Sequence, residues 1–542
     1  MTYAHSLALT LAVASGSAHA MSDAALADLV GERLQGDRTG ACMAVAVVEK
    51  GAVARTFACA DPKDLARIGP DTAFEIGSVS KTMTAALLAD LIRQGKGSLD
   101  DPLSAWLPEG TKLPEYQGKP ILLRHVVTHT AGLPALPSRM AAPSMDDPYA
   151  KLDAATLLAS LGDVTLTAAP GSKFEYSNFA SMVLSYAVAR RAGSDMETLL
   201  KQRLFAPLGM RHAYVNVAPA GVRPAQGHTP NTRAASAWDF QTDLAGVGGV
   251  RATLDDMVRY VQGQLGSEAT AISPALQLSQ QKVSDTPPMA MNWMLMPVGG
   301  RTVHVHEGGT GGFSSFVSFD KTQQRGVVIL SDTTWNSIGS LGSLGLHLVD
   351  ASFPLGKPRR EAKPDTALLD ALAGEYALAG GMKMTLRRNG DALEIRAAGQ
   401  GVYAMGYDNA GDFYPREFDA VLRPQRTQEG QTFTWLQMGG VMPAKRVDAA
   451  PKATVNVDTA TLKDYEGEYP LVPSFALTVK AQGETLTIQG TGQPALPVQA
   501  VERDVFVMDA VGAEIRFERD AAGKVIALTL KQAGQQLRGE RK

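Results

Sequence analysis

The 542-residue chain has almost no net charge, only two cysteines and, after its first 20 residues, no long apolar run. Lys and Arg total 52 and Asp and Glu total 55, so the formal net charge of −3 offers no electrostatic footprint for nucleic acid or an anionic membrane. A membrane helix needs roughly 18 or more apolar residues in a row, which no later segment approaches. We therefore predict a protein without a membrane span and without a nucleic-acid partner.

The beginning of the chain has the pattern of an export signal. A mostly apolar run, Ser6 to Ala20, ends in Ala18-His19-Ala20, which fits a small-residue cleavage site. The residues before it contain no Lys or Arg, unlike most signal peptides. We predict that residues 1–20 are a signal peptide and that the protein is periplasmic or secreted.

Ser78 and Lys81 form a Ser-x-x-Lys pattern that runs directly into an apolar helical segment, Met83 to Ile92. Residues i and i+3 of a helix share a face, so the Lys81 amine would lie beside the Ser78 hydroxyl. A neighbouring cation and the positive end of the helix dipole both favour the alkoxide. The spacing alone says little, because a second copy begins at Ser279 without glycines around it. Any catalytic partners must be found elsewhere in the chain.

Two further segments supply candidate partners. Tyr176 and Asn178 lie in a polar turn before a helical pattern, and loops on a rigid scaffold often carry catalytic groups. His306 follows an alternating strand and begins a glycine-rich run that includes Gly308 and Gly309. Glycines leave room for close approach, so these positions either admit a substrate or make a tight turn. The histidine two residues earlier, at position 304, shares the strand face with His306, and we interpret it as structural.

The order Ser-x-x-Lys, Tyr-x-Asn, His-x-Gly resembles the penicillin-recognising serine hydrolases: class C β-lactamases, their carboxypeptidase and D-aminopeptidase relatives, and esterases of the same fold. The resemblance covers roughly residues 24–353, and residues 74–81 look like the active-site signature of the class C group. The stretches 123–134, 204–210 and 246–256 also look familial. This resemblance implies an α+β fold with a β-lactamase/transpeptidase-like catalytic domain.

The resemblance also implies a role for each site residue. Ser78 would be acylated, Lys81 and Tyr176 would share the proton transfers, and Asn178 would orient the substrate amide and Lys81. The backbone N–H groups of Ser78 and Gly309 would form an oxyanion hole, in which one donor typically contributes about 3 to 4 kcal/mol. A tyrosine with a free pKa of about 10 is a poor base. We expect the neighbouring ammonium to bring the pKa of Tyr176 closer to neutral.

One position departs from the class C pattern. Those enzymes usually carry Lys-Thr-Gly at the third motif, whereas this chain has His306-Glu307-Gly308, a form that resembles carboxypeptidases, D-aminopeptidases and esterases of the fold. A near-permanent cation is thus replaced by a group with a pKa of about 6.5. We expect His306 to act as a neutral imidazole, because Lys81 already supplies a cation nearby.

These observations predict a serine acyl hydrolase of class C β-lactamase type that works through an acyl-enzyme on Ser78 and hydrolyses β-lactam or related amide bonds. A D-amino-acid peptidase or a carboxylesterase using the same residues stays open, as does a penicillin-binding sensor that is acylated without turnover. The expected partner is a small-molecule substrate, namely a β-lactam, a D-amino peptide or an ester. We expect no cofactor and no metal, and the sequence leaves the oligomeric state open.

The two cysteines flank a predicted hairpin with the two-residue turn Lys50-Gly51. Counting outward from that turn, Cys42 faces Cys59 at a non-hydrogen-bonded pair, where side chains are closest and the Cα separation suits a disulfide. Two buried free thiols are the alternative. In protein made in an oxidising compartment we predict the disulfide.

The C-terminal third contains a duplication. Gly374-Glu375-Tyr376 recurs as Gly467-Glu468-Tyr469, and further matches continue at the same offset of 93 residues without a gap. Short alternating segments followed by turn signals predict a small antiparallel β-barrel in each copy. The predicted organisation is therefore a signal peptide (1–20), a catalytic domain (21–356) and two barrels (365–448 and 456–542).

Overall fold

The computed structural model describes residues 20–141, 146–378, 381–427, 430–437, 440–447, 455–472, 475–493, 495–508, 513–532 and 535–542. The predicted signal peptide, apart from Ala20, lies outside these residues. The chain divides into two compact units, Met1–Arg360 and Glu361–Lys542. None of the helices in the described ranges combines the length and the apolar character that crossing a bilayer requires.

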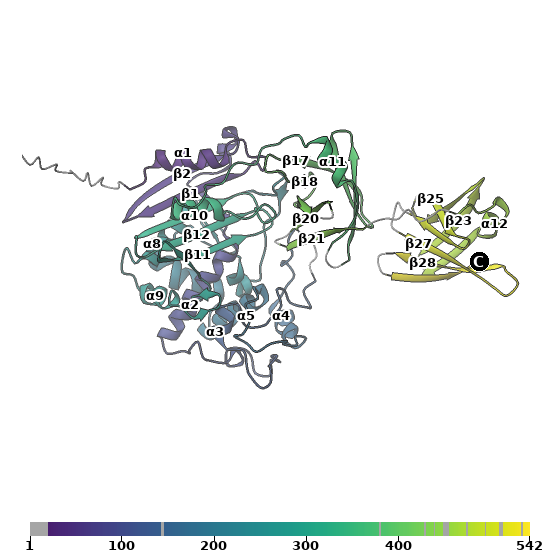
Figure 1. The fold of residues 1–542 in the computed structure, drawn as a ribbon. Helices are drawn as coiled ribbons and strands as arrows, with labels where there is room; N and C mark the ends of the chain where they lie inside the picture. The colour runs from purple at the N-terminus through teal and green to yellow at the C-terminus, as the bar shows by residue number, and fades with distance from the viewer. Residues whose placement is uncertain are drawn as a thin grey trace, which may run out of the picture. The chain divides into compact units, whose positions relative to one another are not determined.

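The first unit is built around an eight-stranded sheet (Figure 1) with the strand order β2-β1-β13-β12-β11-β10-β9-β8. Its neighbouring strands pair antiparallel throughout. The strands are β1 (Cys42–Glu49), β2 (Ala52–Cys59), β8 (Ser284–Asp285), β9 (Pro288–Met289), β10 (Met294–Val298), β11 (Arg301–Gly309), β12 (Ser314–Asp320) and β13 (Arg325–Ser331). Shorter strands are β3 (Thr72–Glu75), β4 (Arg223–Pro224), β5 (Gly227–His228), β6 (Ala234–Ala235) and β7 (Arg251–Ala252).

Helices cover both faces of this sheet. Successive side chains of a strand point to opposite faces. On β12, Phe316 packs against Gly345 of α10, whereas Val317 belongs to the large core shared with α8 and the other helices. The helices are α1 (Asp23–Leu34), α2 (Ser80–Arg93), α3 (Leu123–Val127), α4 (Ala154–Leu161), α5 (Asn178–Ala192), α6 (Met196–Leu200), α7 (Ala206–Leu208), α8 (Leu254–Leu265), α9 (Ser273–Ser279) and α10 (Gly342–Val349). Tighter 3-10 turns, η1 (Pro62–Arg67), η2 (Gly77–Val79), η3 (Leu103–Trp106) and η5 (Thr242–Val247), and a π-turn, η4 (Lys201–Phe205), connect them.

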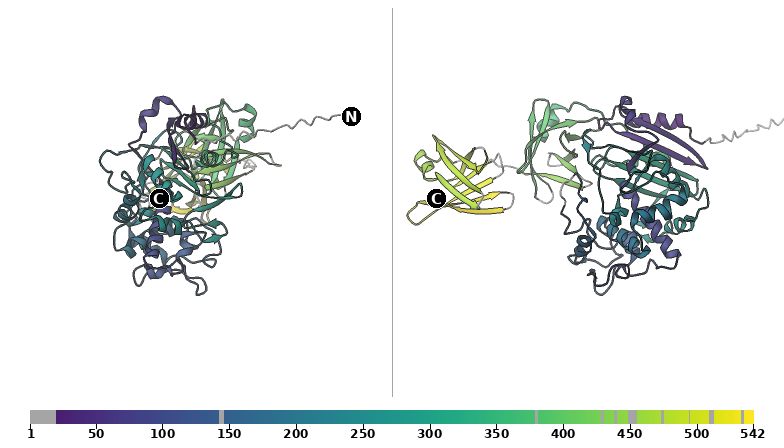
Figure 2. Two further views of the ribbon diagram at one scale, coloured as in Figure 1. Left: turned by 90° about the vertical axis from the view of Figure 1, so that its left-hand side faces the viewer. Right: turned by 180° about the vertical axis from the view of Figure 1, so that it is seen from behind.

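Helices α2 and α5 lie together in the interior of the unit. Twelve of the 14 residues of α2 are buried, as expected for a helix that is packed on all sides. Helix α5 begins where the Ser177 hydroxyl accepts a hydrogen bond from the Ala180 N–H (2.9 Å), and it ends at Gly193, whose φ of 70° is left-handed. Seen from behind in Figure 2, these helices lie away from the purple hairpin β1–β2.

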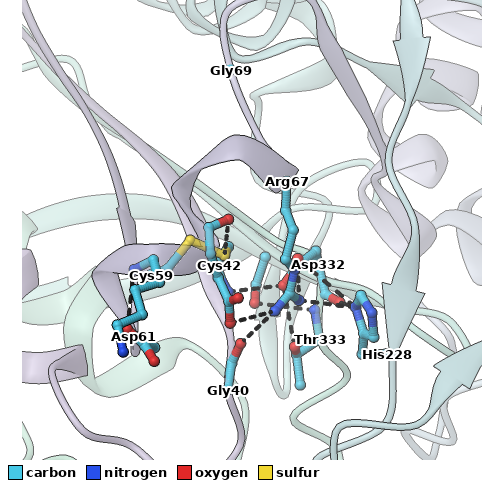
Figure 3. The surroundings of a disulfide bond; sticks show 12 residues. Gly40, Cys42, Cys59, Asp61, Arg67, Gly69, His228, Asp332 and Thr333 are labelled. Carbon is cyan, nitrogen blue, oxygen red and sulfur yellow. Dashed lines mark hydrogen bonds and ion pairs between the residues drawn. A yellow bond between two sulfur atoms is a disulfide. The ribbon is translucent and has the colours of Figure 1, made fainter.

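The N-terminal hairpin has the predicted register. Glu49 pairs with Ala52 across the two-residue turn, and Cys42 pairs with Cys59 at the far end of the hairpin. These cysteines are joined by a disulfide (Figure 3), which resolves the alternative of two free thiols in favour of the bridge.

Asp332, which directly follows β13, ties this end of the hairpin to the neighbouring turns (Figure 3). Its buried carboxylate accepts a hydrogen bond from the Cys42 N–H (2.8 Å) and pairs with the Arg67 guanidinium (2.5 Å). Arg67 in turn donates to the Gly40 carbonyl (3.0 Å) and to Nδ1 of His228 (3.0 Å). The disulfide therefore joins the edge strand β2 to β1 next to a polar network centred on the buried Asp332 carboxylate.

The second unit contains two eight-stranded antiparallel sheets, each preceded by a short helix (Figures 1 and 2). The first is a closed barrel and the second is barrel-shaped, its first and last strands in contact. The elements of the first copy are α11 (Thr366–Leu372), β14 (Gly374–Leu378), β15 (Lys383–Asn389), β16 (Ala392–Ala397), β17 (Val402–Tyr407), β18 (Phe413–Pro415), β19 (Val421–Thr427), β20 (Gly430–Gln437) and β21 (Gly440–Arg446). Those of the second are α12 (Thr459–Asp464), β22 (Gly467–Val472), β23 (Phe475–Gln482), β24 (Thr485–Gly490), β25 (Leu496–Glu502), β26 (Val505–Met508), β27 (Ala513–Arg519), β28 (Val525–Gln532) and β29 (Gln535–Glu540).

The two copies agree element by element, so the predicted duplication is confirmed. Strands β16 and β24 are offset by 93 residues at both ends, as are the first residues of α11 and α12. The repeated tyrosines are equivalent too: the Tyr376 hydroxyl donates to the Leu372 carbonyl (2.9 Å), and the Tyr469 hydroxyl donates to the Tyr465 carbonyl (2.8 Å). Together with the first unit, these barrels confirm the predicted fold class.

Candidate active site

Ser78 lies in the 3-10 turn η2, immediately before helix α2. The turn and the first helical turn bring Lys81 to the same side, where its Nζ donates a hydrogen bond to Ser78 Oγ across 2.8 Å. This is the contact that the Ser-x-x-Lys spacing predicts. The second copy of the pattern is different: the hydroxyl of Ser279 is bonded to the Leu276 carbonyl (2.8 Å), and Lys282 forms an exposed ion pair with Asp285.

The Lys81 amine is enclosed by protein. The side chain is 1% exposed, and its second hydrogen bond goes to the Val247 carbonyl of η5 (2.8 Å). Burial lowers the pKa of Lys81 to about 7, because an ammonium loses its hydration there. A large fraction of the amine is therefore neutral near pH 7 and can accept a proton from Ser78.

Tyr176 lies beside this pair, just before the start of α5. Its phenol shares a hydrogen bond with Ser78, and Lys81 Nζ lies 5.2 Å from the centre of its ring. The expectation that the ammonium would lower the pKa of Tyr176 is wrong, since burial raises it to about 12. The side chain is 40% exposed overall, yet enough protein surrounds its hydroxyl to disfavour the phenolate, and the nearby amine carries only part of a charge.

His306 lies on β11 with its ring buried near Lys81. Its Nδ1 donates to the Glu307 carbonyl (2.7 Å), so in the neutral ring Nε2 is an acceptor. Burial, reinforced by the charge of Lys81, lowers the pKa of His306 to about 3. The expected neutral imidazole agrees with this environment. His304, two residues earlier, donates Nε2 to the Gln280 carbonyl (3.0 Å) and stacks on Phe319, which is a packing role.

The glycines of the third motif are required by contacts within the protein. A Cβ on Gly308 would clash with the carbonyl oxygen of Ile76, and a Cβ on Gly77 would lie 2.6 Å from the Gly309 nitrogen. Gly77 also has a left-handed φ of 49°. The end of β11 and the turn that carries Ser78 therefore pack backbone against backbone. For Gly308 this is a different reason for glycine from the substrate approach or tight turn considered from the sequence.

A small pocket opens beside Ser78. Its lining is mostly aromatic side chains and glycine: Ser78, Tyr149, Asn178, Trp238, Phe240, Val247, Gly248, Gly309 and Thr310. The Tyr149 ring stacks on Phe240 (4.9 Å between centroids) and meets Trp238 edge-on (5.3 Å). Both predicted oxyanion donors, Ser78 and Gly309, line this space.

Three buried polar atoms of the lining, Asn178 Oδ1, Trp238 Nε1 and Thr310 Oγ1, have no hydrogen-bond partner within the described ranges. Asn178 was expected to orient Lys81, but it interacts with the Tyr149 hydroxyl, and the hydrogen bonds of Lys81 go to Ser78 and Val247. The pocket thus offers an amide oxygen as acceptor, an indole N–H as donor and a hydroxyl that can do either. In the described parts of the chain, no group of three or more His, Cys, Asp or Glu side chains is placed to hold a metal ion.

The sequence did not reveal Tyr149, Trp238, Phe240 or Val247 as parts of the site. These residues come from segments outside the three motifs and carry no spacing signal of their own, although Val247 falls in the stretch 246–256 that looks familial. His129 was also missed as an individual residue, although it falls in one of the stretches that look familial. It stacks on Tyr176 with 4.3 Å between ring centroids.

The chain is similar to known proteins in both units. Residues 26–336 match the family model described as Beta-lactamase, and residues 451–541 match a domain of unknown function, DUF3471. The D-alanyl-D-alanine-carboxypeptidase/endopeptidase AmpH of Escherichia coli K12 is 29% identical in an alignment of 313 positions that covers 53% of this chain and 78% of AmpH. A Beta-lactamase of the same organism is 28% identical in an alignment of 331 positions that covers 54% of this chain and 84% of that protein.

Solved structures with a similar chain path include the D-alanine carboxypeptidase AmpC from Burkholderia cenocepacia. It is 26% identical, and the match covers 60% of this chain and 96% of AmpC with a TM-score of 0.47.

Proposed function

This chain belongs to the beta-lactamase family of serine hydrolases, and we propose that it works through an acyl-enzyme on Ser78 and hydrolyses β-lactam or related amide bonds. The relatives named above include a D-alanyl-D-alanine carboxypeptidase and a β-lactamase, and these names support an amide or lactam carbonyl as the reacting group. The observation that carries the proposal is the 2.8 Å hydrogen bond between Lys81 and Ser78 at an amine whose pKa is about 7.

In the proposed acylation, the neutral Lys81 amine accepts the Ser78 hydroxyl proton while Oγ bonds to the substrate carbonyl carbon. The carbonyl oxygen becomes an oxyanion facing the N–H groups of Ser78 and Gly309. The C–N bond then breaks, and the leaving nitrogen takes a proton from the Lys81–Tyr176 pair. Tyr176 suits the donor role, because its pKa of about 12 keeps the phenol protonated. Water then cleaves the acyl ester by the reverse proton path.

Esters are a second candidate substrate class, and the neutral His306 favours them. A carboxylate beside the scissile bond would gain from a cation at this position, whereas an uncharged ester does not need one. Burial keeps His306 uncharged, since its pKa is about 3. The aromatic pocket lining also suits an apolar acyl group.

We also propose a periplasmic or secreted location. The support is the Cys42–Cys59 disulfide, because such bonds persist in oxidising compartments and are rare where thiols are kept reduced.

A three-substrate panel tests the proposed function: a chromogenic cephalosporin, a D-alanyl anilide and a short-chain nitrophenyl ester. Hydrolysis of the cephalosporin or the anilide with repeated turnover is the expected result. Hydrolysis of the ester alone would show that the protein is an esterase and not an amide or lactam hydrolase. A burst of one product equivalent followed by arrest would show a penicillin-binding sensor instead.

A further inference from the structure

His129 lies in the turn after α3, buried beneath the catalytic tyrosine. The side chain is 1% exposed, and the backbone φ of 54° is left-handed, which is uncommon for any residue other than glycine. Its ring stacks on Tyr176 with 4.3 Å between centroids and a 30° angle, and it meets Phe174 edge-on at 6.1 Å. A buried residue in this backbone region is held there by its surroundings.

Two hydrogen bonds fasten the segment that carries Tyr176 to this histidine. The Glu175 N–H donates to the His129 carbonyl (2.7 Å), and the Ser177 N–H donates to His129 Nδ1 (3.3 Å). The residues directly before and after Tyr176 are therefore both hydrogen-bonded to His129, and the Tyr176 ring stacks on the His129 imidazole. Because a backbone N–H can only donate, Nδ1 is unprotonated and the proton of the neutral ring is on Nε2.

Other hydrogen bonds join the same two segments, 129–134 and 171–177, without involving the Tyr176 ring. The Gly171 N–H donates to the Thr130 carbonyl (2.7 Å), and the Ser177 hydroxyl donates to the Pro134 carbonyl (2.6 Å). The tyrosine itself is 40% exposed, and Lys81 Nζ lies 5.2 Å from the centre of its ring. His129 stacks on that ring, and its Nδ1 holds the backbone of the next residue, Ser177, in place.

We propose that His129 is a positioning residue that holds the Tyr176 hydroxyl in line with Ser78 and Lys81 through the Ser177 N–H···Nδ1 bond and the stacked ring. The proposal rests on the proposed acyl-transfer function. The hydrogen bond from Ser177 needs a neutral ring, since a protonated Nδ1 could not accept. Burial, reinforced by the charge of Lys81, lowers the pKa of His129 to about 3, so the acceptor is retained at working pH.

Asparagine and glutamine substitutions distinguish the roles of Nδ1 and Nε2 of His129. In His129→Asn, the amide oxygen can take the place of Nδ1, and asparagine tolerates a left-handed backbone. In His129→Gln, the amide reaches toward Nε2 and leaves the Ser177 N–H without its acceptor. His304→Asn is the matched control, because His304 is also buried and stacked on an aromatic ring, but its hydrogen bond goes to the Gln280 carbonyl, outside the site.

The measurements are kcat and KM for the panel substrate that the wild-type protein hydrolyses, together with the thermal midpoint of each variant. We expect His129→Gln to lower kcat by roughly 10²-fold with little change in KM, as a small misplacement of a catalytic group does. His129→Asn should recover at least tenfold of that loss. His304→Asn should lower the thermal midpoint and leave kcat near the wild-type value.

A folded His129→Gln protein with wild-type kcat would overturn the proposal. Equal losses of kcat in the Asn and Gln variants, in proportion to the drop in their thermal midpoints, would also overturn it. If His129→Gln does not fold, His129→Phe keeps a ring against Tyr176 but lacks the acceptor, and a wild-type kcat in that variant would be equally contrary. Failure of the wild-type protein to turn over any panel substrate would instead contradict the proposed function.

Discussion

Lys81 Nζ lies 2.8 Å from Ser78 Oγ and donates a hydrogen bond to it from one helical turn further along the chain. The same amine is bonded to the Val247 carbonyl at an equal distance, and no carboxylate of the described residues forms an ion pair with it. Burial without a counter-ion makes the neutral amine accessible near pH 7, which a surface lysine is not. This pair is the chemical centre of the site, and two predictions follow from it directly.

Replacing Ser78 by alanine should abolish turnover and covalent labelling by a β-lactam or a fluorophosphonate, because the acceptor of the acyl group is removed. Intact-protein mass spectrometry measures the labelling. Ser279→Ala is the matched control, since Ser279 heads the other Ser-x-x-Lys pattern but bonds to the Leu276 carbonyl, and it should label normally. Labelling of Ser78→Ala at the wild-type level would refute the assignment.

The pH dependence of kcat/KM should report Lys81. A base must be deprotonated, so activity should rise as pH passes through about 7 and then level off, following the lowered pKa of Lys81. Neither Tyr176, with a pKa of about 12, nor His306, with a pKa of about 3, should change the activity between pH 5 and 9. Lys81→Arg carries a permanent cation and should be inactive at every pH. A flat profile between pH 5 and 9 would contradict the role of Lys81 as base.

The local parts of the site could be predicted from the sequence. The Ser78–Lys81 contact follows from helical spacing over four residues, and the Cys42–Cys59 pairing follows from counting outward from a two-residue turn. The duplication could be found because residues such as Gly374-Glu375-Tyr376 recur 93 positions later, and the Tyr376 and Tyr469 hydroxyl bonds are equivalent too. In each case the information lies in short-range geometry or in direct repetition.

What could not be predicted depends on contacts between distant segments. Val247 binds Lys81 from 166 residues away in the sequence, and His129 meets Ser177 across 48 residues, with no pattern linking either pair. The direction of the Tyr176 pKa was predicted wrongly for a related reason. The sequence shows which charge is nearby, but it does not show how much protein surrounds a hydroxyl, and here burial outweighs the charge.

The Cys42–Cys59 disulfide should stabilise the first unit. The two residues are 17 positions apart, and closing a loop of that size in the unfolded chain contributes about 3 kcal/mol. The double variant Cys42→Ala/Cys59→Ala should therefore unfold at lower urea concentration, with a free energy of unfolding reduced by about that amount. In wild-type protein made in an oxidising compartment, thiol titration under denaturing conditions should find no free thiol. A titre of two thiols would disprove the bridge.

His306→Lys tests whether the third motif selects the substrate. Wild-type His306 is neutral, so a lysine there adds a cation beside the pocket, and a hydrogen bond to a charged group contributes about 1.5 to 3 kcal/mol. The ratio of kcat/KM for a carboxylate-bearing cephalosporin to that for an uncharged nitrophenyl ester should rise roughly tenfold or more. His306→Asn, which stays neutral, is the control and should lower both values together. The added cation also repels the Lys81 ammonium and lowers the pKa of Lys81 further, so the rise of kcat/KM with pH should be centred below 7 in the lysine variant. An unchanged substrate ratio in His306→Lys would show that this position does not determine substrate choice.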